Sequence, residues 1–193
     1  MFQAVSSSMD PTLTTGECAV ARHVEGTDWK PTRGDVIVFR HPLKDLIFLF
    51  RVIGLPGDRV QLREGRVILN DAPLARSREP DFNYRMVPQG PEASMPRCPT
   101  AVATGGTCTI ARFRETLPSG ASYSIADMGS YSLDDTPIFR VPDAHVFVLG
   151  DNRDNATDSR VAQTAGGPGF IPFANIIGVF DDLAPAPATG ATK

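Results

Sequence analysis

Three consecutive serines near the start of the chain, Ser6, Ser7 and Ser8, are the first residues whose type could support chemistry. A serine hydroxyl is a weak nucleophile unless a neighbouring base removes its proton. A lysine can act as that base only when burial lowers its pKa far enough to keep the amine neutral. Serines are common in loops, so this cluster by itself identifies no function.

Four segments of the chain place the serines in a longer pattern. In order they read SSSMDPTL (6–13), RGDVIVF (33–39), LFRVIGLPGD (49–58) and GDNRDNATDSR (150–160). They resemble the boxes of the bacterial signal peptidase I family, which are S-x-S-M-x-P-T-L, R-G-D-x-V-V-F, K-R-V-x-G-L-P-G-D and G-D-N-R-D-N-S-x-D-S-R. That family cleaves secretory signal peptides with a serine nucleophile and a lysine general base.

The resemblance implies a role for several residues. Ser8 stands at the position of the nucleophile, and the Ser6 hydroxyl would stabilise the oxyanion together with the backbone N–H of Ser8. Arg51, Asp158 and Arg160 match family residues that form an ion-paired network behind the site.

The chain departs from the family pattern at two positions that matter for catalysis. Phe50 stands where the family has its lysine, and Ala156 stands where the family has a serine that orients the lysine amine. Residues alternate between the two faces of a strand, so Leu46, Phe48 and Phe50 share one face and Phe50 points where the lysine would point. A phenyl ring cannot accept a proton. With no amine at position 50, a hydroxyl at position 156 would lose its partner, so the two departures form a coherent pair.

No other residue is an obvious substitute for the missing base. Lysine occurs only at positions 30, 44 and 193. Lys44 lies six residues before Phe50, which places its attachment point roughly 20 Å away along a strand at about 3.3 Å per residue. Asp10, two residues after Ser8, is a possible weak base.

Three functional hypotheses follow from the resemblance and these departures. The first is a signal-peptidase-I-like serine endopeptidase scaffold with impaired catalysis, which binds signal peptides or other extended peptides by strand addition. The second is an active peptidase that uses an unusual base. The third is a non-catalytic peptide-binding or regulatory subunit that partners an active peptidase. The retained Ser8 favours some residual chemistry, and no cofactor is expected.

Composition and charge set limits on the partners. The chain has 193 residues, 41% hydrophobic and 21% charged, which fits one globular domain, or one domain with a sizeable insertion. The net charge of -3 argues against nucleic acid. The histidines at 23, 41 and 145 lack metal-ligand spacing, so no metal is expected.

The resemblance also implies a location. No stretch approaches 18 apolar residues, and family members carry a membrane anchor just before the serine box. We therefore expect a fragment that lacks its anchor, from a protein that meets the membrane surface on the periplasmic face of the bacterial inner membrane. A natural soluble form is the alternative.

Short apolar segments rich in Val, Ile and Phe predict a mainly β fold. Strands are expected at 36–39, 46–53, 66–69 and 145–149, with a hairpin turn at Glu64 and Gly65. The resemblance implies a signal-peptidase-type coiled β core, assigned to residues 1–74 and 141–183. An inserted, loop-rich β subdomain is expected at 75–140, where the prolines at 80, 88, 91, 96 and 99 should break any long element, and 184–193 should be a disordered tail.

Cys98 and Cys108 lie close together in this insertion. In an extracytoplasmic protein such a pair favours a disulfide, although two free thiols remain the alternative.

Overall fold

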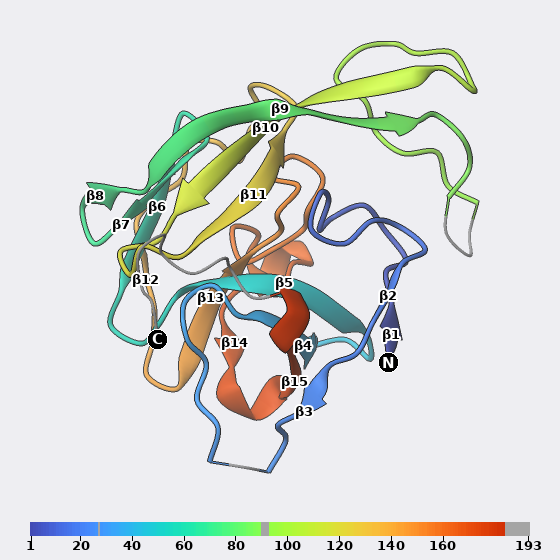
Figure 1. Ribbon diagram of the computed structural model, residues 1–193. Helices are drawn as coiled ribbons and strands as arrows, with labels where there is room; N and C mark the ends of the chain where they lie inside the picture. Colours follow the sequence, from blue (N-terminus) through green and yellow to red (C-terminus); the bar gives the residue numbers. More distant parts are fainter. Residues whose placement is uncertain (27, 90–92, 184–193) are drawn as a thin grey trace, which may run out of the picture.

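The computed structural model describes residues 1–26, 28–89 and 93–183, so the predicted tail at 184–193 lies outside the described residues. Its strands form antiparallel sheets of six, four, three and two strands (Figure 1). The helices in the described part are single 3-10 turns, η1 (Gln163–Ala165), η2 (Phe173–Asn175) and η3 (Asp181–Leu183). None of them is long and apolar enough to cross a bilayer.

The six-stranded sheet contains β5, the strand that carries Phe50. Its order is β14-β13-β5-β4-β15-β3, with bounds β3 (Arg22–His23), β4 (Val36–Arg40), β5 (Ile47–Gly54), β13 (His145–Leu149), β14 (Ile171–Pro172) and β15 (Ile176–Phe180). The first four residues of β4 are buried, as expected for an apolar run in a central strand. The predicted strands at 36–39, 46–53 and 145–149 are thus confirmed, with β5 beginning one residue later than expected.

A four-stranded sheet begins with the strand that follows β5 along the chain. It contains β6 (Arg59–Arg63), β7 (Arg66–Leu69), β8 (Ala72–Pro73) and β12 (Phe139–Arg140) in the order β12-β6-β7-β8. Glu64 and Gly65 connect β6 to β7 with φ angles of 49° and 70°. Two consecutive positive φ angles match the twist of antiparallel strands, which confirms the predicted hairpin.

The region 75–140 contains longer strands than its prolines suggested. β9 (Ala75–Arg85), β10 (Thr107–Thr116) and β11 (Ser122–Asp127) form the three-stranded sheet seen across the top of Figure 1. The expectation that Pro80 breaks such an element is wrong. β9 is an edge strand, and its register against β10 shifts at Pro80, where Phe82 pairs with Ile110 but Glu79 pairs with Arg112. Proline is tolerated on an edge and at a bulge because no ladder hydrogen bond is needed there.

The β9–β11 sheet packs on the rest of the protein rather than standing apart. Tyr123 and Ile125 of β11 share a buried cluster with Ile53, Val60 and Phe147 of the other sheets. Beyond this cluster, β9 and β10 extend as an arm (Figure 1). A disulfide joins Cys98 to Cys108 near the outer end of the arm, where β10 begins and Cys108 pairs with Tyr84. The third cysteine, Cys18, is exposed and free.

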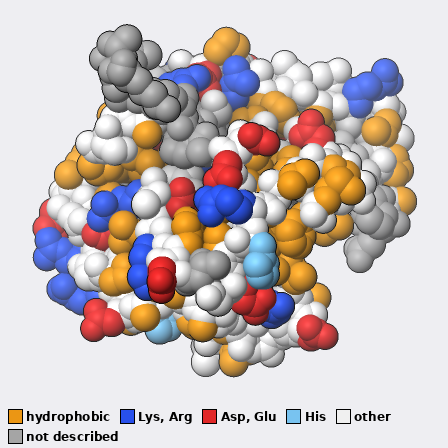
Figure 2. Space-filling model, turned by 60° about the horizontal axis from the view of Figure 1, so that its bottom comes forward, with side chains coloured by type: hydrophobic (Ala, Val, Ile, Leu, Met, Phe, Trp, Pro, Cys, Tyr) orange, Lys and Arg blue, Asp and Glu red, His pale blue; other side chains and the backbone are white. Residues whose placement is uncertain are grey.

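Charged side chains of both signs are mixed on the face shown in Figure 2, where basic and acidic groups lie side by side between apolar patches. No large area of a single sign stands out on this face.

Candidate functional site

The serine loop, residues 6–9, lies between the short strands β1 (Phe2–Gln3) and β2 (Cys18–Ala19). Hydrogen bonds from the segment after β13 fix it in place. The backbone N–H of Asn152 donates to the carbonyl of Ser8 (3.1 Å), and its side-chain amide donates to the carbonyl of Ser7 (2.9 Å). The amide of Asn155 donates to the Ser7 hydroxyl at 2.5 Å. The first and last family-like boxes therefore meet in space.

Phe50 occupies a fully apolar position in β5. Its side chain is 2% exposed, and its ring centroid lies 5.9 Å from that of Phe48 and 6.2 Å from that of Phe39. Phe48 and Phe50 are two residues apart in one strand, so they share a face as the alternation predicted. Leu46, expected on the same face, lies outside β5 and is 53% exposed.

Gly150 lies next to three of the positions that the family pattern singled out, Ser8, Phe50 and Ala156. A Cβ atom placed on it would lie 2.3 Å from Cβ of Ala156, 2.7 Å from the carbonyl oxygen of Ser8 and 3.3 Å from Cε1 of Phe50. Only glycine leaves room for so close an approach. Ser8, Phe50 and Ala156 are distant in sequence, yet all three contact this one residue.

The Ser8 hydroxyl has a single hydrogen-bond partner in the described part of the chain. The Ser6 hydroxyl donates to it at 3.2 Å. Among the described residues, no lysine, histidine or acidic side chain is within hydrogen-bonding distance of it. Lys44 instead donates to the carbonyl of Gly166 at 2.6 Å, and Nε2 of His41 lies 3.0 Å from the carbonyl of Gly167.

Asp10 is the titratable residue nearest to Ser8 in sequence, and its environment is unusual. The residue is 4% exposed, and its Oδ1 has no hydrogen-bond partner among the described residues. Burial, reinforced by the negative charge of Glu17, raises the pKa of the Asp10 carboxyl to about 7. Near neutral pH this carboxyl is therefore only partly ionised.

The charged residues behind the site form two separate ion pairs. Arg51 does not pair with Asp158: its guanidinium forms two hydrogen bonds with Asp151, at 2.8 and 2.6 Å, and both residues are 1% exposed. Thr12, close to the serine loop, donates its hydroxyl to the same carboxylate. Burial acts to lower the pKa of Arg51, but the Asp151 carboxylate outweighs it and raises the pKa.

Asp158 and Arg160 pair with each other, at 2.8 and 2.9 Å. The Asp158 carboxylate also accepts a hydrogen bond from the N–H of Gly150 at 3.0 Å. This bond holds Gly150 in its place beside Ser8, Phe50 and Ala156.

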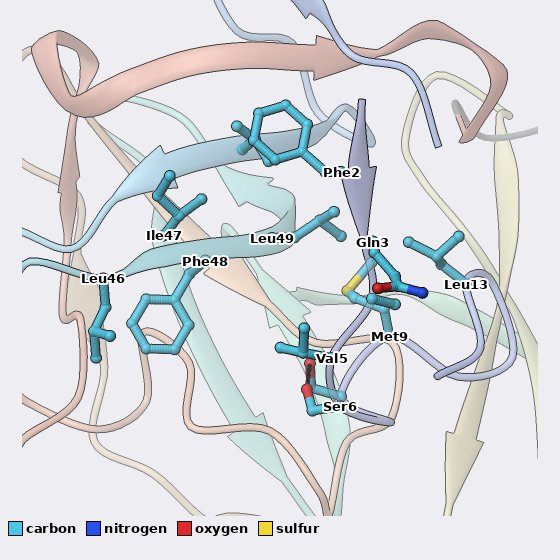
Figure 3. A pocket seen from close by; sticks show the side chains of 13 residues that line it. Phe2, Gln3, Val5, Ser6, Met9, Leu13, Leu46, Ile47, Phe48 and Leu49 are labelled. Atoms are coloured by element: carbon cyan, nitrogen blue, oxygen red, sulfur yellow. Dashed lines mark hydrogen bonds between the residues drawn. The ribbon is translucent and has the colours of Figure 1, made fainter. Parts of the chain in front are cut away.

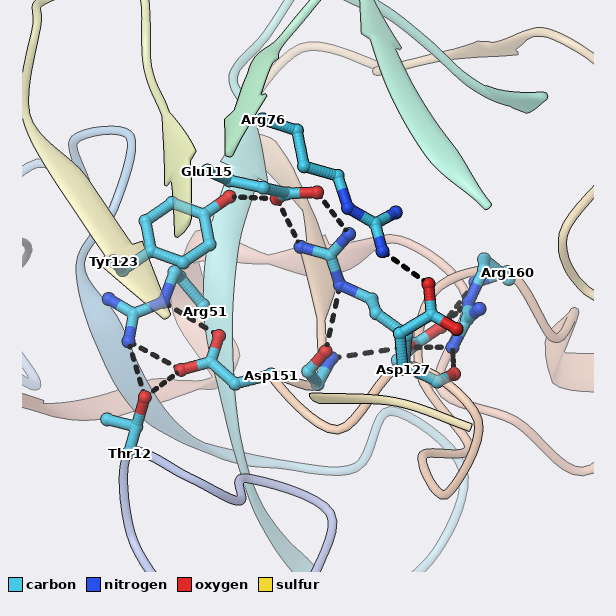
Figure 4. Close-up of polar contacts among 11 residues, drawn as sticks. Thr12, Arg51, Arg76, Glu115, Tyr123, Asp127, Asp151 and Arg160 are labelled. Carbon is cyan, nitrogen blue, oxygen red and sulfur yellow. Dashed lines mark hydrogen bonds and ion pairs between the residues drawn. The ribbon is translucent and has the colours of Figure 1, made fainter. Parts of the chain in front are cut away.

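A third buried ion pair links the core to the β9–β11 sheet. Arg153 donates twice to Glu115 of β10, at 2.9 and 2.5 Å, and Tyr123 of β11 donates to the same carboxylate at 2.9 Å (Figure 4). The sequence assigned no role to Asp151, Arg153 or Glu115. The available signal was weak: Asp151 and Arg153 stand inside the segment 150–160, but nothing local shows which opposite charge each residue would meet.

An apolar groove of about 250 Å³ lies beside the serine loop (Figure 3). Its lining includes Ser6 and Ser8 together with Phe2, Val5, Met9, Leu13, Leu46, Phe48 and Leu49. One edge of β5 is open here. β4 pairs with residues 47–51, whereas β13 pairs only with Arg51, Val52 and Gly54, so among the described strands none pairs with residues 47–50 on the side away from β4.

No group of three or more His, Cys, Asp or Glu side chains in the described residues is placed to hold a metal ion. What the site offers is a hydroxyl pair, an apolar groove and buried ion pairs.

Comparison with known proteins identifies the family. The family described as signal peptidase, peptidase S26, matches residues 1–181. Signal peptidase I of Rickettsia typhi is 36% identical over 157 residues, which cover 77% of this chain and 50% of that protein. Signal peptidase I of Rickettsia canadensis is 35% identical over 156 residues, covering 77% and 49%. The chain spans about half the length of these relatives.

The chain belongs to the signal peptidase I family. A crystal structure of a signal peptidase I from Enterococcus faecalis is similar with a TM-score of 0.41 and 23% identity, covering 79% of this chain and 97% of that one.

Proposed function

We propose that this chain is a signal-peptidase-I-like scaffold that binds secretory signal peptides, or similar extended peptides, and hydrolyses them very slowly or not at all. The observation that carries the proposal is the surroundings of Ser8. The Phe50 ring and the Ala156 methyl group take the two places where the family pattern has lysine and serine, and the Ser8 hydroxyl is hydrogen-bonded only to Ser6 among the described residues. A serine without a base loses roughly 10⁴-fold or more in turnover.

Peptide binding is supported by the open edge of β5. An extended peptide placed along residues 47–50 would form main-chain hydrogen bonds with an edge strand, and alternate side chains would enter the apolar groove. The oxyanion donors expected from Ser6 and the Ser8 backbone would then face the peptide carbonyl that lies over Ser8. In the cell this site would face the periplasm, at the surface of the inner membrane.

The test combines binding and cleavage on one signal-peptide substrate. We expect saturable binding by fluorescence anisotropy and no product by mass spectrometry, with Ser8→Ala unchanged in both. Leu46→Asp places a charge in the groove and should weaken binding by about tenfold or more. Leu43→Asp is the matched control, because Leu43 is 67% exposed and does not line the groove.

Two results would contradict the proposal. Turnover comparable to that of an intact family member, and abolished by Ser8→Ala, would show that a base exists. Absence of binding, or equal weakening by Leu46→Asp and Leu43→Asp, would show that the apolar groove is not a peptide site.

One observation favours an active peptidase as a second candidate. Asp10 is buried, lacks a partner for Oδ1 and has a pKa of about 7, the range suited to a general base. It forms no hydrogen bond with Ser8 in this structure, so it would have to reorient. In that case Asp10→Asn would remove all Ser8-dependent turnover.

A further inference from the structure

A second cleft adjoins the serine loop on the other side of Val5 and Ser6, which line both this cleft and the apolar groove. Its volume is about 220 Å³. One wall is formed by Ser6 and Ser7, and the opposite wall by Ser94, Met95, Pro96 and Arg97, the residues that precede the disulfide. A neighbouring hollow of about 270 Å³ shares Arg97 and Asn155 with it and reaches Ala156. Together the two form one path, here called the polar cleft.

The polar cleft differs from the apolar groove in its chemistry. Hydroxyl and amide groups of Ser6, Ser7, Gln89, Ser94 and Asn155 line the part nearest to Ser8. Such groups suit a hydrated, sequence-tolerant peptide segment rather than an apolar side chain. A peptide lying across Ser8 would therefore meet an apolar surface on one side of that residue and a polar one on the other.

Arg97 brings an exposed positive charge to this cleft. Its backbone is held by the adjacent Cys98–Cys108 disulfide and by the Tyr84 hydroxyl, which donates to the Arg97 carbonyl. Its guanidinium donates to the backbone carbonyl of Asp154 at 3.3 Å, and within the described residues it has no ion-pair partner.

Among the described residues that line the cleft, the other charged side chains are engaged elsewhere. Arg153 is paired with Glu115 at 2.5 Å, and the Asp154 carboxyl accepts the N–H of Met128 at 2.6 Å. Arg97 is therefore the exposed charge that a ligand in the cleft would meet first, and guanidinium groups pair with carboxylates in a geometry that Lys does not match.

A peptide that is bound but not cut keeps the segment beyond Ser8, so it must occupy space on both sides of that residue. We propose that the polar cleft binds the part of the peptide that follows the residue over Ser8, and that Arg97 favours an acidic side chain there. This inference rests on the function proposed above. It adds that the protein prefers an acidic side chain in the part of the peptide that follows the residue over Ser8.

The experiment measures the affinity of the protein for three labelled signal peptides. The first carries an Asp in the segment that follows the residue over Ser8, the second carries a Lys at the same place, and the third ends at the residue over Ser8. We expect the Asp form to bind about threefold more tightly than the Lys form, a size typical of an exposed ion pair. Arg97→Gln should remove this preference and Arg97→Glu should reverse it. Arg63→Gln, which removes one exposed arginine from the β6–β7 hairpin, should leave it unchanged.

Two outcomes separate this inference from the proposed function. If the short peptide binds as tightly as the long forms, or if Arg97→Glu keeps the preference for Asp, the inference is wrong although peptide binding stands. If no form binds the wild-type protein, the proposed function is wrong and the inference falls with it.

Discussion

Phe50 and Ala156 contact the same glycine, so changes at the two positions act on one small volume of the protein. The approach at Gly150 is tight enough that even a methyl group there would overlap Ala156 and the Ser8 carbonyl. A side chain introduced at position 50 would therefore lie close to whatever stands at position 156. Substitutions at positions 50 and 156 can therefore be combined to test whether the site lacks only its general base.

Restoring both family residues should restore some hydrolysis. Phe50→Lys supplies an amine in an apolar setting that favours its neutral form, and Ala156→Ser supplies an oxygen to orient it. We expect the rate of the double mutant to exceed the sum of the two single mutants, as for groups that act as a unit. The measurement is kcat/KM on a signal-peptide substrate for the wild type, both single mutants and the double mutant.

Ser8→Ala in the double-mutant background serves as the control and should return the rate to background. A double mutant that folds and binds the substrate but stays at background would show that the groove itself has diverged.

The buried Asp10 carboxyl should make stability fall as pH rises. Its pKa is about 3.8 in the unfolded chain and about 7 in the folded one, so between these values the folded state holds more protons. The contribution of Asp10 to the free energy of unfolding is then highest below pH 4, declines through this window and is lowest above pH 7. Asp10→Asn should flatten the decline and raise the free energy of unfolding at pH 8 by about 1–3 kcal/mol. Urea denaturation at pH 5 and pH 8 checks this, and an equal pH dependence in both proteins would refute it.

At the scale of elements, the arm formed by β9, β10 and the disulfide loop decides what faces the serine loop. β9 is long because Pro80 lies at a bulge on an edge strand, and β10 carries Cys108, which is fully buried among Met86, Ile110 and Ala126. The disulfide ties the loop that carries Arg97 to this buried cluster.

Removing the disulfide should loosen the arm more than the core. For a sequence separation of 10, the chain-entropy model gives a loss of about 3 kcal/mol for Cys98→Ser/Cys108→Ser. Hydrogen exchange should show the greatest loss of protection around residues 84–110, with β4 and β5 little changed. The Cys18→Ser variant, which removes only the free thiol, is the control. Uniform loss of protection across the molecule would contradict a local role.

At the scale of the whole molecule, buried ion pairs connect parts of the chain that are far apart in sequence. Arg51 reaches Asp151 in the core, and Arg153 reaches Glu115 in the β9–β11 sheet. Burial acts to lower the pKa of Arg153, but the Glu115 carboxylate outweighs it and raises the pKa, so the guanidinium stays charged. A buried charge that loses its partner is costly, which makes these links sensitive to single substitutions.

Glu115→Gln should therefore destabilise the protein strongly. It leaves the Arg153 guanidinium, 3% exposed, without its counter-charge, at a cost of about 3–5 kcal/mol. The Glu115→Gln/Arg153→Met double mutant should recover part of that loss, because no unpaired charge remains. Thermal or urea unfolding of the three proteins measures the effect. A double mutant less stable than Glu115→Gln would show that the arginine contributes mainly through its other contacts.

The sequence by itself determined the family, the mainly β fold, the Glu64–Gly65 hairpin and the apolar strand that carries Phe50. Each of these depends on the identity of neighbouring residues or on the alternation along one strand, and such signals are local. The same locality explains the error at Pro80, because a proline disrupts a central strand but not the bulged edge that β9 turned out to be.

Only the tertiary structure decided which distant residues meet. Three contacts join segments about 40–150 residues apart in the sequence. Ser8, Phe50 and Ala156 meet at Gly150, Arg51 pairs with Asp151 and not with Asp158, and Arg97 lines a cleft together with the serine loop. Such contacts are set by how the sheets twist and stack, and a charged or small residue carries no local mark of the partner that folding will bring to it.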